Sequence, residues 1–367
     1  MIETFELRHA RGTTWHAYGP GALRRGAEEL AAALAGRAAF AVSSRPVLDL
    51  HGGSLRSAFE PVVGRLEVLE VSDGEAAKCV AGAETLWRRL SAAGGKRDSV
   101  LLAFGGGSVG ALTGFVAGSF LRGVEWIQLP TTLLAQVDAA VGGKTAIDLP
   151  EAKNAVGLFH HPRAVLAESA VLGTLGPEAR RCGLVEAIKA AALLDLPLLE
   201  RIEGSLDELL AGAPGPLGVV AAGAARAKAA LVETDPEEAG PRMLLNLGHT
   251  IGHALEAEIG YGRIAHGDAV AHGLRFALRL SLERGAETGY VARLERLLDR
   301  LGTPPLPALD PERLVARLGR DKKARETGLA WVLVEGPGRG RVARDVPEPA
   351  IRAQLESWLD GRVRKSL

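Results

Sequence analysis

The sequence is poor in cysteine. Cys79 and Cys182 are the only two in 367 residues, and neither lies in a CxxC or other metal-binding spacing. So few cysteines cannot build the disulfide framework that is typical of small secreted proteins. We therefore expect a protein of the reducing cytoplasm.

An excess of either charge is also lacking. Lysine and arginine together number 44, as do aspartate and glutamate, so the formal net charge is zero. A nucleic-acid-binding protein normally carries a basic excess or patch, so we do not expect nucleic acid as a partner. An anionic ligand must instead be bound by a local cluster of cations.

Long apolar runs are missing as well. No stretch of about 18 apolar residues occurs, which predicts that no segment spans a membrane. The first residues, MIETFELRHARG, carry charges early and contain no apolar core, so we expect no signal peptide. The sequence therefore favours a soluble protein without a membrane partner.

The chain is long enough for two domains, because a single hydrophobic core usually stops growing near ~250–300 residues. Short apolar runs in the first half alternate with helical patterns, which predicts parallel βαβ units and an α/β domain over residues 1–168. The predicted strands are 38–42, 100–104, 126–129 and 164–167, and the predicted helices are 21–35 and 75–93.

The pattern of apolar residues changes near residue 172. Helical patterns then dominate, and residues 329–334 form the one late strand pattern. These features predict a mainly α-helical domain over residues 169–367, with helices at 178–194, 217–234, 244–259 and 268–283.

A cluster of three glycines follows a predicted strand and opens a helical stretch. Glycines at Gly105, Gly106 and Gly107 would let the backbone approach a pyrophosphate, whose charge the free N–H groups of the helix start would bind. The spacing differs from GxGxxG, so a simple tight turn remains an alternative.

A second motif combines cations with small residues. Lys144 follows two glycines, and Lys153 and Asn154 follow within eleven residues. Two ammonium groups and an amide could bind a phosphate. The alternative is a solvated basic loop, but the flanking residues are more apolar than such a loop normally is.

Three histidines suggest a metal site. His249 and His253 are four residues apart and share one helix face, and His266 lies thirteen residues after His253, between small and acidic residues. Glu186 stands among apolar helix residues, where a buried carboxylate needs a partner or a metal. The alternatives are packed histidines and a surface Glu186 paired with Lys189.

These motifs together resemble one family, the 3-dehydroquinate synthases. The resemblance extends from about residue 70 to residue 335 through eight segments in register: GGGSVGALTGFVA, FLRGV, QLPTTLLAQVDAAVGGKTAID, KNAVGLFHHP, GLVEAIK, LLNLGHTIGHALE, HGDAVAHG and RDKK. It implies a Rossmann-like NAD-binding domain over 1–168, and a helical metal- and substrate-binding domain over 169–367.

The resemblance also implies roles for individual residues. A divalent metal, zinc or cobalt, would be bound by Glu186, His249 and His266. The cofactor NAD would be bound by Glu75, Lys78, Gly105, Gly106, Gly107, Thr131, Thr132, Asp138, Lys144 and Lys153. The substrate and its phosphate would be bound by Arg122, Lys144, Asn154, Lys228, Arg242, Asn246, His253, Lys322 and Lys323. The catalytic residues would be Lys144, Lys228, Glu238, Arg242, Asn246 and His253.

The implied reaction converts 3-deoxy-D-arabino-heptulosonate 7-phosphate to 3-dehydroquinate and phosphate in the shikimate pathway of aromatic amino acid biosynthesis. Lys228 and Arg242 would bind the substrate carboxylate, and Glu238 would lie near the reacting carbons. Transient oxidation by NAD would acidify a C–H bond, phosphate would leave by β-elimination, and the hydride would return before an aldol closes the ring. Arg122 would reach across the interface of a homodimer.

Two positions depart from the family pattern. Ala111 stands where the family usually has an aspartate near the nicotinamide, and Asp268 gives HGD in place of HGE. Three alternatives stay open at this point. They are another sugar phosphate cyclase, such as a 2-epi-5-epi-valiolone synthase, a metal-dependent polyol dehydrogenase, and a non-catalytic homologue.

Overall fold

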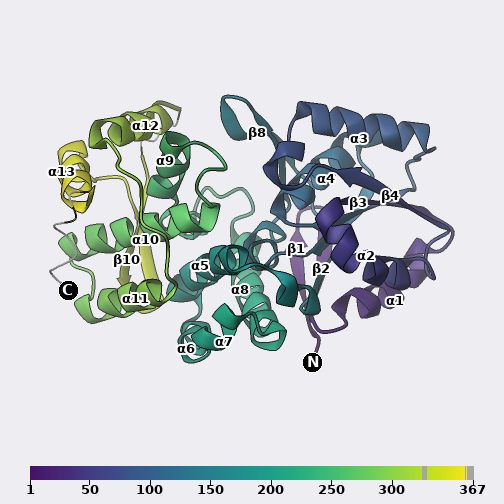
Figure 1. The fold of residues 1–367 in the computed structure, drawn as a ribbon, viewed down its shortest axis with the longest axis horizontal. Coiled ribbons are helices and arrows are strands. Elements are labelled where there is room, and N and C mark those ends of the chain that lie inside the picture. Colours follow the sequence, from purple (N-terminus) through teal and green to yellow (C-terminus); the bar gives the residue numbers. More distant parts are fainter. Residues whose placement is uncertain (325–328, 360, 362–367) are drawn as a thin grey trace. The chain divides into compact units, whose positions relative to one another are not determined.

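The computed structural model describes residues 1–324, 329–359 and 361, with the side chains of residues 319–324 outside the description. The chain forms two compact units, Met1–Gly183 with Ser205–Pro236, and Leu184–Gly204 with Glu237–Leu367. The α/β and helical fold classes expected from the sequence are confirmed (Figure 1). The domains 1–168 and 169–367 stay a prediction. Packing groups Ser205–Pro236 with the first unit.

The first unit is built on a seven-stranded sheet of order β1-β2-β9-β6-β5-β3-β4. Only β1 and β2 are antiparallel, and the other neighbouring pairs are parallel. The strands are β1 (Glu3–His9), β2 (Gly12–Gly19), β3 (Ala38–Ser44), β4 (Arg65–Val71), β5 (Val100–Gly105), β6 (Glu125–Pro130) and β9 (Ala164–Glu168). The four strands predicted in this half are therefore confirmed.

Alternating side chains place a hydrophobic core on each face of this sheet. In β5, Leu102 and Phe104 point into one core and Leu101 and Ala103 into the other. A strand buried on both faces has a continuous apolar sequence, which is why 100–104 could be recognised. The helices α1 (Ala22–Leu34) and α2 (Arg45–Phe59) supply one core, and α3 (Val80–Ala92) and α4 (Gly107–Ser119) supply the other (Figure 1).

Shorter elements complete the first unit. The hairpin β7 (Lys144–Leu149) and β8 (Ala152–Phe159) forms a separate two-stranded sheet. The remaining elements are the 3-10 helices η1 (Gly74–Ala77), η2 (Phe120–Arg122) and η4 (Ala170–Thr174), the π-helical turn η3 (Ala135–Ala139), and the helices α7 (Leu206–Ala211) and α8 (Pro214–Thr234). Helix α5 (Pro177–Leu194) begins in this unit and continues into the second.

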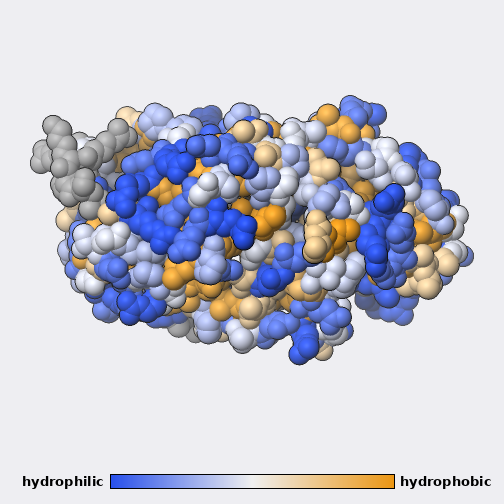
Figure 2. Space-filling model, turned by 90° about the horizontal axis from the view of Figure 1, so that it is seen from below, coloured by the Kyte–Doolittle hydropathy of each residue, from blue (hydrophilic) through white to orange (hydrophobic). Residues whose placement is uncertain are grey.

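Helix α8 is a core helix of the first unit. Among the described residues it alone is long and apolar enough to cross a membrane by length and composition. More than half of its apolar stretch is buried, it packs against β1 and β2, and Arg226 and Lys228 interrupt it. On the face drawn in Figure 2, hydrophilic residues are interspersed with apolar patches.

The second unit is mainly helical. Its helices are α6 (Leu196–Gly204), η5 (Pro241–Asn246), α9 (His249–Ile259), α10 (His266–Glu283), α11 (Thr288–Arg300), α12 (Pro311–Ala324) and α13 (Glu348–Leu359), and its hairpin is β10 (Trp331–Gly336) with β11 (Arg339–Ala343). Ile251 and Leu255 of α9 share one core with Phe276 of α10 and Trp331 of β10.

Glycines allow α9 and α10 to pack backbone to backbone. A Cβ atom at Gly273 would overlap the carbonyl oxygen of Gly248, and one at Gly252 would lie 3.3 Å from the carbonyl oxygen of Ala269. Gly248 precedes α9 with a φ of 80°, a conformation that favours glycine. This contact brings the first turns of α9 and α10 together.

We expect Gly273→Ala to lower the free energy of unfolding by roughly 1–3 kcal/mol, because the added methyl group must push α9 away from α10. Chemical denaturation measures the change. Gly289→Ala is the matched control, since Gly289 lies in α11 with nothing within 4 Å of its Cβ position. Equal stability of the two variants would contradict the close contact.

Candidate active site

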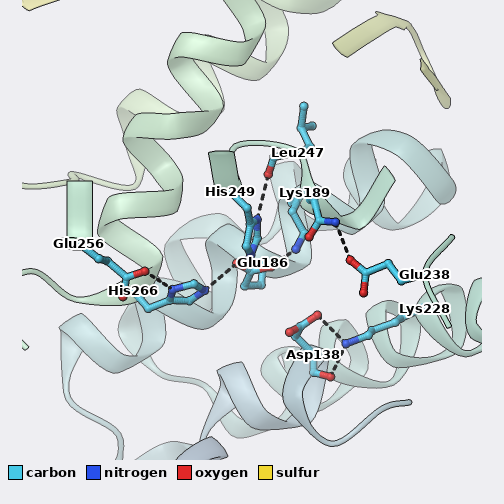
Figure 3. A network of polar contacts seen from close by, with 10 residues as sticks. Asp138, Glu186, Lys189, Lys228, Glu238, Leu247, His249, Glu256 and His266 are labelled. Atoms are coloured by element: carbon cyan, nitrogen blue, oxygen red, sulfur yellow. Dashed lines mark hydrogen bonds and ion pairs between the residues drawn. The ribbon is translucent and has the colours of Figure 1, made fainter. Parts of the chain in front are cut away.

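Three candidate metal ligands meet in the second unit. Glu186 projects from α5, and His249 and His266 are the first residues of α9 and α10 (Figure 3). The Nε2 atoms of His249 and His266 lie 3.5 and 3.6 Å from Oε1 of Glu186. A tetrahedral ion with bonds of ~2.1 Å separates its ligand atoms by about 3.4 Å, so the three residues fit a divalent metal.

The carboxylate of Glu186 is the second sign of a metal. Its side chain is 1% exposed, and neither oxygen has a partner with hydrogen-bond geometry among the described residues. Lys189 forms an ion pair with it and is equally buried. The alternative of a surface pair between Glu186 and Lys189 is therefore wrong in one respect, because the pair forms but lies in the interior.

Both histidines turn the other ring nitrogen toward an acceptor. Nδ1 of His249 lies 3.3 Å from the carbonyl oxygen of Leu247, and Nδ1 of His266 lies 3.3 Å from Oε2 of Glu256 (Figure 3). Burial lowers the pKa of His266, but the hydrogen bond with Glu256 and the charges of Glu186 and Glu256 outweigh it. The pKa is therefore raised.

His253 lies one turn after His249 on α9. Its ring is exposed and stands edge-on to that of His249, with centroids 5.3 Å apart. His253, Glu256 and His266 form a second group whose ligand atoms lie within 4.8 Å of one another.

A second set of predicted residues precedes α9. Arg242 in η5 is 1% exposed, and its Nε lies 4.0 Å from Oε2 of Glu238. Asn246 donates a hydrogen bond of 2.5 Å to Oε1 of the same carboxylate. Glu238 has a φ of 62°, which is uncommon outside glycine and costs free energy. The structure thus brings Glu238, Arg242 and Asn246 together.

In the first unit, the buried Lys228 forms an ion pair with the half-buried Asp138. The ammonium group of Lys228, which is 8% exposed, donates 2.7 and 2.8 Å hydrogen bonds to the backbone oxygen and Oδ1 of Asp138 (Figure 3). Asp138 lies in the π-helical turn η3, a rare geometry that is frequently found at functional sites.

The three glycines lie at the carboxyl end of β5, where α/β proteins bind ligands. A Cβ at Gly105 would lie 2.7 Å from Cβ of Val109, and one at Gly106 would lie 3.1 Å from Cγ2 of Thr132. Thr131 donates its backbone N–H to the oxygen of Gly105 at 2.9 Å. Tight packing therefore explains these glycines, and the first N–H groups of α4 lie beside them.

A polar network surrounds the start of α4. Ser108 donates to Oε1 of Glu75 at 2.6 Å, and Lys78 bridges Glu75 and Asp148 at 3.1 and 3.2 Å. Asp148 also accepts a 2.6 Å hydrogen bond from the backbone N–H of Asn154. Burial raises the pKa of Glu75, but the charge of Lys78 and the hydrogen bond from Ser108 lower it by more. The pKa is therefore below its usual value, and the carboxylate stays ionised.

The other predicted residues lie on the hairpin, on η2 and on α12, and the charge of Lys153 helps to lower the pKa of Glu75. Lys144 begins β7, and Lys153 and Asn154 lie on β8 of the same hairpin, where Lys144 faces Phe159. Arg122 is exposed in η2, with a φ of 67°. Lys322 and Lys323 lie in the last turn of α12, and their side chains are outside the described residues.

Four polar residues beside the predicted ones were not expected from the sequence to be parts of the site: Ser108, Asp148, Lys189 and Glu256. Ser108 directly follows the glycines, and Lys189 is one turn from Glu186, so their proximity could have been inferred. Asp148 contacts Lys78, 70 positions earlier in the chain, and Glu256 contacts His266 on another helix. Sequence spacing carries no signal for contacts of that kind.

Solved structures first define the class of protein. A 2-deoxy-scyllo-inosose synthase complexed with carbaglucose-6-phosphate, NAD+ and Co2+ is 26% identical, with a TM-score of 0.87, over 97% of this chain and 99% of its own. A 2-epi-5-epi-valiolone synthase from Streptomyces hygroscopicus with NAD+ and Zn2+ bound is 26% identical, with a TM-score of 0.83, over 91% and 93%. An iron-containing alcohol dehydrogenase is 16% identical, with a TM-score of 0.70, over 98% of this chain and 99% of its own, and this likeness shows the fold alone. The fold and the site therefore define a sugar phosphate cyclase.

Sequence comparison then gives the family. The 3-dehydroquinate synthase N-terminal model matches residues 68–182, and the C-terminal model matches residues 183–324. The 3-dehydroquinate synthase of Symbiobacterium thermophilum is 42% identical over 88% of this chain and 90% of its own. That of Caulobacter vibrioides is 40% identical over 92% and 94%. The chain belongs to the 3-dehydroquinate synthase family.

We expect Glu186→Ala and His249→Ala each to abolish stoichiometric zinc binding, because two ligands alone cannot hold the ion against water. Metal content after dialysis, measured by atomic emission, tests this. His272→Ala is the control, since His272 lies on α10 with His266 but binds the carbonyl oxygen of Pro304 at 2.8 Å. Full zinc content in either ligand variant would refute the assignment.

Proposed function

We propose that the protein converts 3-deoxy-D-arabino-heptulosonate 7-phosphate to 3-dehydroquinate and phosphate, with NAD and a divalent metal, zinc or cobalt. Family membership at 42% identity supports the reaction. The observation that carries the proposal is the buried carboxylate of Glu186, whose oxygens have no partner of hydrogen-bond geometry among the described residues, beside two histidine Nε2 atoms. When bound, the metal supplies Lewis acidity and NAD accepts and returns one hydride.

The residues of the chain would bind and orient the substrate. Lys228 and Arg242 would bind the carboxylate of the substrate. In the structure these cations contact Asp138 and Glu238, and the substrate carboxylate would replace these two acidic side chains. Buried cations need an anion nearby, and a sugar phosphate without a carboxylate would not supply one to Lys228 and Arg242. The two residues therefore favour an acidic substrate over that of a neutral-sugar cyclase.

The phosphate would be bound by several cations and amides, as the family resemblance implies. These are Arg122, Lys144, Asn154, Asn246, His253, and Lys322 or Lys323. Because the substrate phosphate is an oxygen base close to the C–H bond that ionises, it would accept that proton itself. The chain then needs no separate strong base for the elimination, and its part is to hold the phosphate in place.

The cofactor would lie on Gly105, Gly106 and Gly107, with its pyrophosphate at the N-terminus of α4. The residues around it would be Glu75, Lys78, Thr131, Thr132, Asp138, Lys144 and Lys153. The hydrogen bond between Ser108 and Glu75 keeps this carboxylate in place at the start of the helix. Ala111 supplies no polar group to the nicotinamide.

We further propose a cytoplasmic homodimer. The exposure of Arg122 on η2, and the positive φ angles of Leu121 and Arg122, are consistent with a side chain presented to a partner subunit. Neither Cys79 nor Cys182 forms a disulfide, which agrees with a reducing compartment.

We expect phosphate release from the heptulosonate phosphate without accumulation of NADH, and its loss on chelation. Coupled phosphate detection and absorbance at the NADH band measure both. NADH formed from polyols without phosphate release would identify a dehydrogenase instead. Turnover only of neutral sugar phosphates would identify a different cyclase.

We expect Lys228→Met to lower kcat/KM for the acidic substrate by roughly 10–100-fold, because a charge-assisted hydrogen bond contributes about 1.5–3 kcal/mol. Arg226→Met is the matched control, since Arg226 lies two residues earlier on α8, is exposed, and pairs with Glu3. Steady-state kinetics of both variants tests the role. An unchanged preference for acidic over neutral sugar phosphates would count against it.

A further inference from the structure

Glu256 is a buried carboxylate next to the metal cluster. It lies on α9 seven residues after His249, so the two side chains project from the same face of the helix. The residue is 2% exposed, and Oε2 lies 3.3 Å from Nδ1 of His266 (Figure 3). Burying such a group costs several kcal/mol unless it has a partner, so its position requires an explanation.

The contact decides which nitrogen of His266 carries the proton. An ionised carboxylate can only accept a hydrogen bond, so Nδ1 of His266 must donate to Glu256. In the neutral imidazole, which is the form that binds a metal, Nε2 is then the unprotonated nitrogen, and it faces Oε1 of Glu186 at 3.6 Å. His249 is arranged in the same way, because the carbonyl oxygen of Leu247 can only accept from Nδ1.

The two histidines differ in the charge of this acceptor. His249 donates to a neutral carbonyl group, whereas His266 donates to a carboxylate. A carboxylate that accepts from the far nitrogen fixes the ring and makes the near nitrogen a stronger ligand. Asp268, two residues from His266, is also buried, but the carboxylate at Nδ1 belongs to Glu256.

We propose that Glu256 is a positioning residue for the metal. It holds His266 in the tautomer and orientation that leave Nε2 free for a divalent ion, and it strengthens that bond. The inference rests on the proposed function, because it assumes that Glu186, His249 and His266 bind the metal. Helix α9 then contributes twice, as the carrier of His249 and as the support of His266.

A direct role of Glu256 as a ligand, together with His253 and His266, is the competing arrangement. It would use Nδ1 of His266 and leave the buried oxygens of Glu186 without a partner of hydrogen-bond geometry. It would also place an exposed histidine in the ligand set. The positioning role satisfies more of the buried polar atoms.

The test measures metal binding by the full-length apoprotein, independently of turnover. Zinc affinity is determined by competition with a chromophoric chelator, and geometry is followed by the visible absorption of bound Co2+. We expect Glu256→Leu to weaken zinc binding about 10–100-fold and to shift the cobalt bands. Glu256→Gln keeps an acceptor for Nδ1–H and should fall between Glu256→Leu and the wild type.

Glu258→Gln is the matched control. Glu258 lies on the same helix with a side chain that is 6% exposed, but it pairs with Arg313 at 2.6 Å and Arg317 at 3.2 Å, so this variant should bind zinc as the wild type does. Wild-type zinc affinity and cobalt bands in both Glu256 variants would overturn the proposal. Loss of zinc in His253→Ala equal to that in His249→Ala would overturn it in favour of the second group.

Metal binding by the protein and the positioning role of Glu256 can be disproved separately. If the wild type binds no stoichiometric zinc or cobalt, the metal part of the proposed function fails and this proposal fails with it. If the wild type binds metal and turns over substrate while Glu256→Gln and Glu256→Leu bind normally, only the role of Glu256 fails. Thermal unfolding in the presence of chelator separates a folding defect in Glu256→Leu from a loss of affinity, and Glu256→Gln preserves the shape of the side chain.

Discussion

The close contact between α9 and α10 is the constraint on which the metal cluster depends. His249 and His266 are the first residues of α9 and α10, so the distance between the two side chains depends on how closely these helices pack. Gly248, Gly252 and Gly273 remove the side chains that would hold the backbones apart. A core of Ile251, Leu255 and Phe276 then fixes the helices in this position. The ligand geometry is therefore a product of backbone packing, and not only of histidine spacing.

Charged residues of the candidate site are buried beside opposite charges. Lys189 pairs with Glu186, Lys228 with Asp138, and Arg242 lies near Glu238. Such pairs offset the cost of taking ions out of water, but they add little net stability. A ligand that supplies its own charge can replace one partner without leaving the other unpaired. Pairs of this kind keep the buried cations beside an opposite charge when no ligand is bound.

Much of the fold could be predicted from the sequence. The buried parallel strands 38–42, 100–104, 126–129 and 164–167 were recognised because they are continuous apolar runs flanked by helical patterns. The hairpin β7–β8 could not be predicted, because β8 is largely exposed and its sequence does not alternate between apolar and polar residues. The packing of Ser205–Pro236 with the first unit was also missed, since a helical pattern says nothing about which unit a helix joins. Proximity of Glu186, His249 and His266 agrees with the metal prediction, whereas Glu256 could not be found because its contact is tertiary.

The shared carboxylate of Asp148 has one further consequence. It accepts from Lys78, a predicted NAD residue, and from the backbone of Asn154, a predicted phosphate residue. A ligand that drew Lys78 toward itself would weaken the ion pair with Asp148, which also holds the backbone of Asn154. Any effect of a cofactor on phosphate binding through this carboxylate would be matched by an equal effect of phosphate on the cofactor, because binding free energies are linked reciprocally.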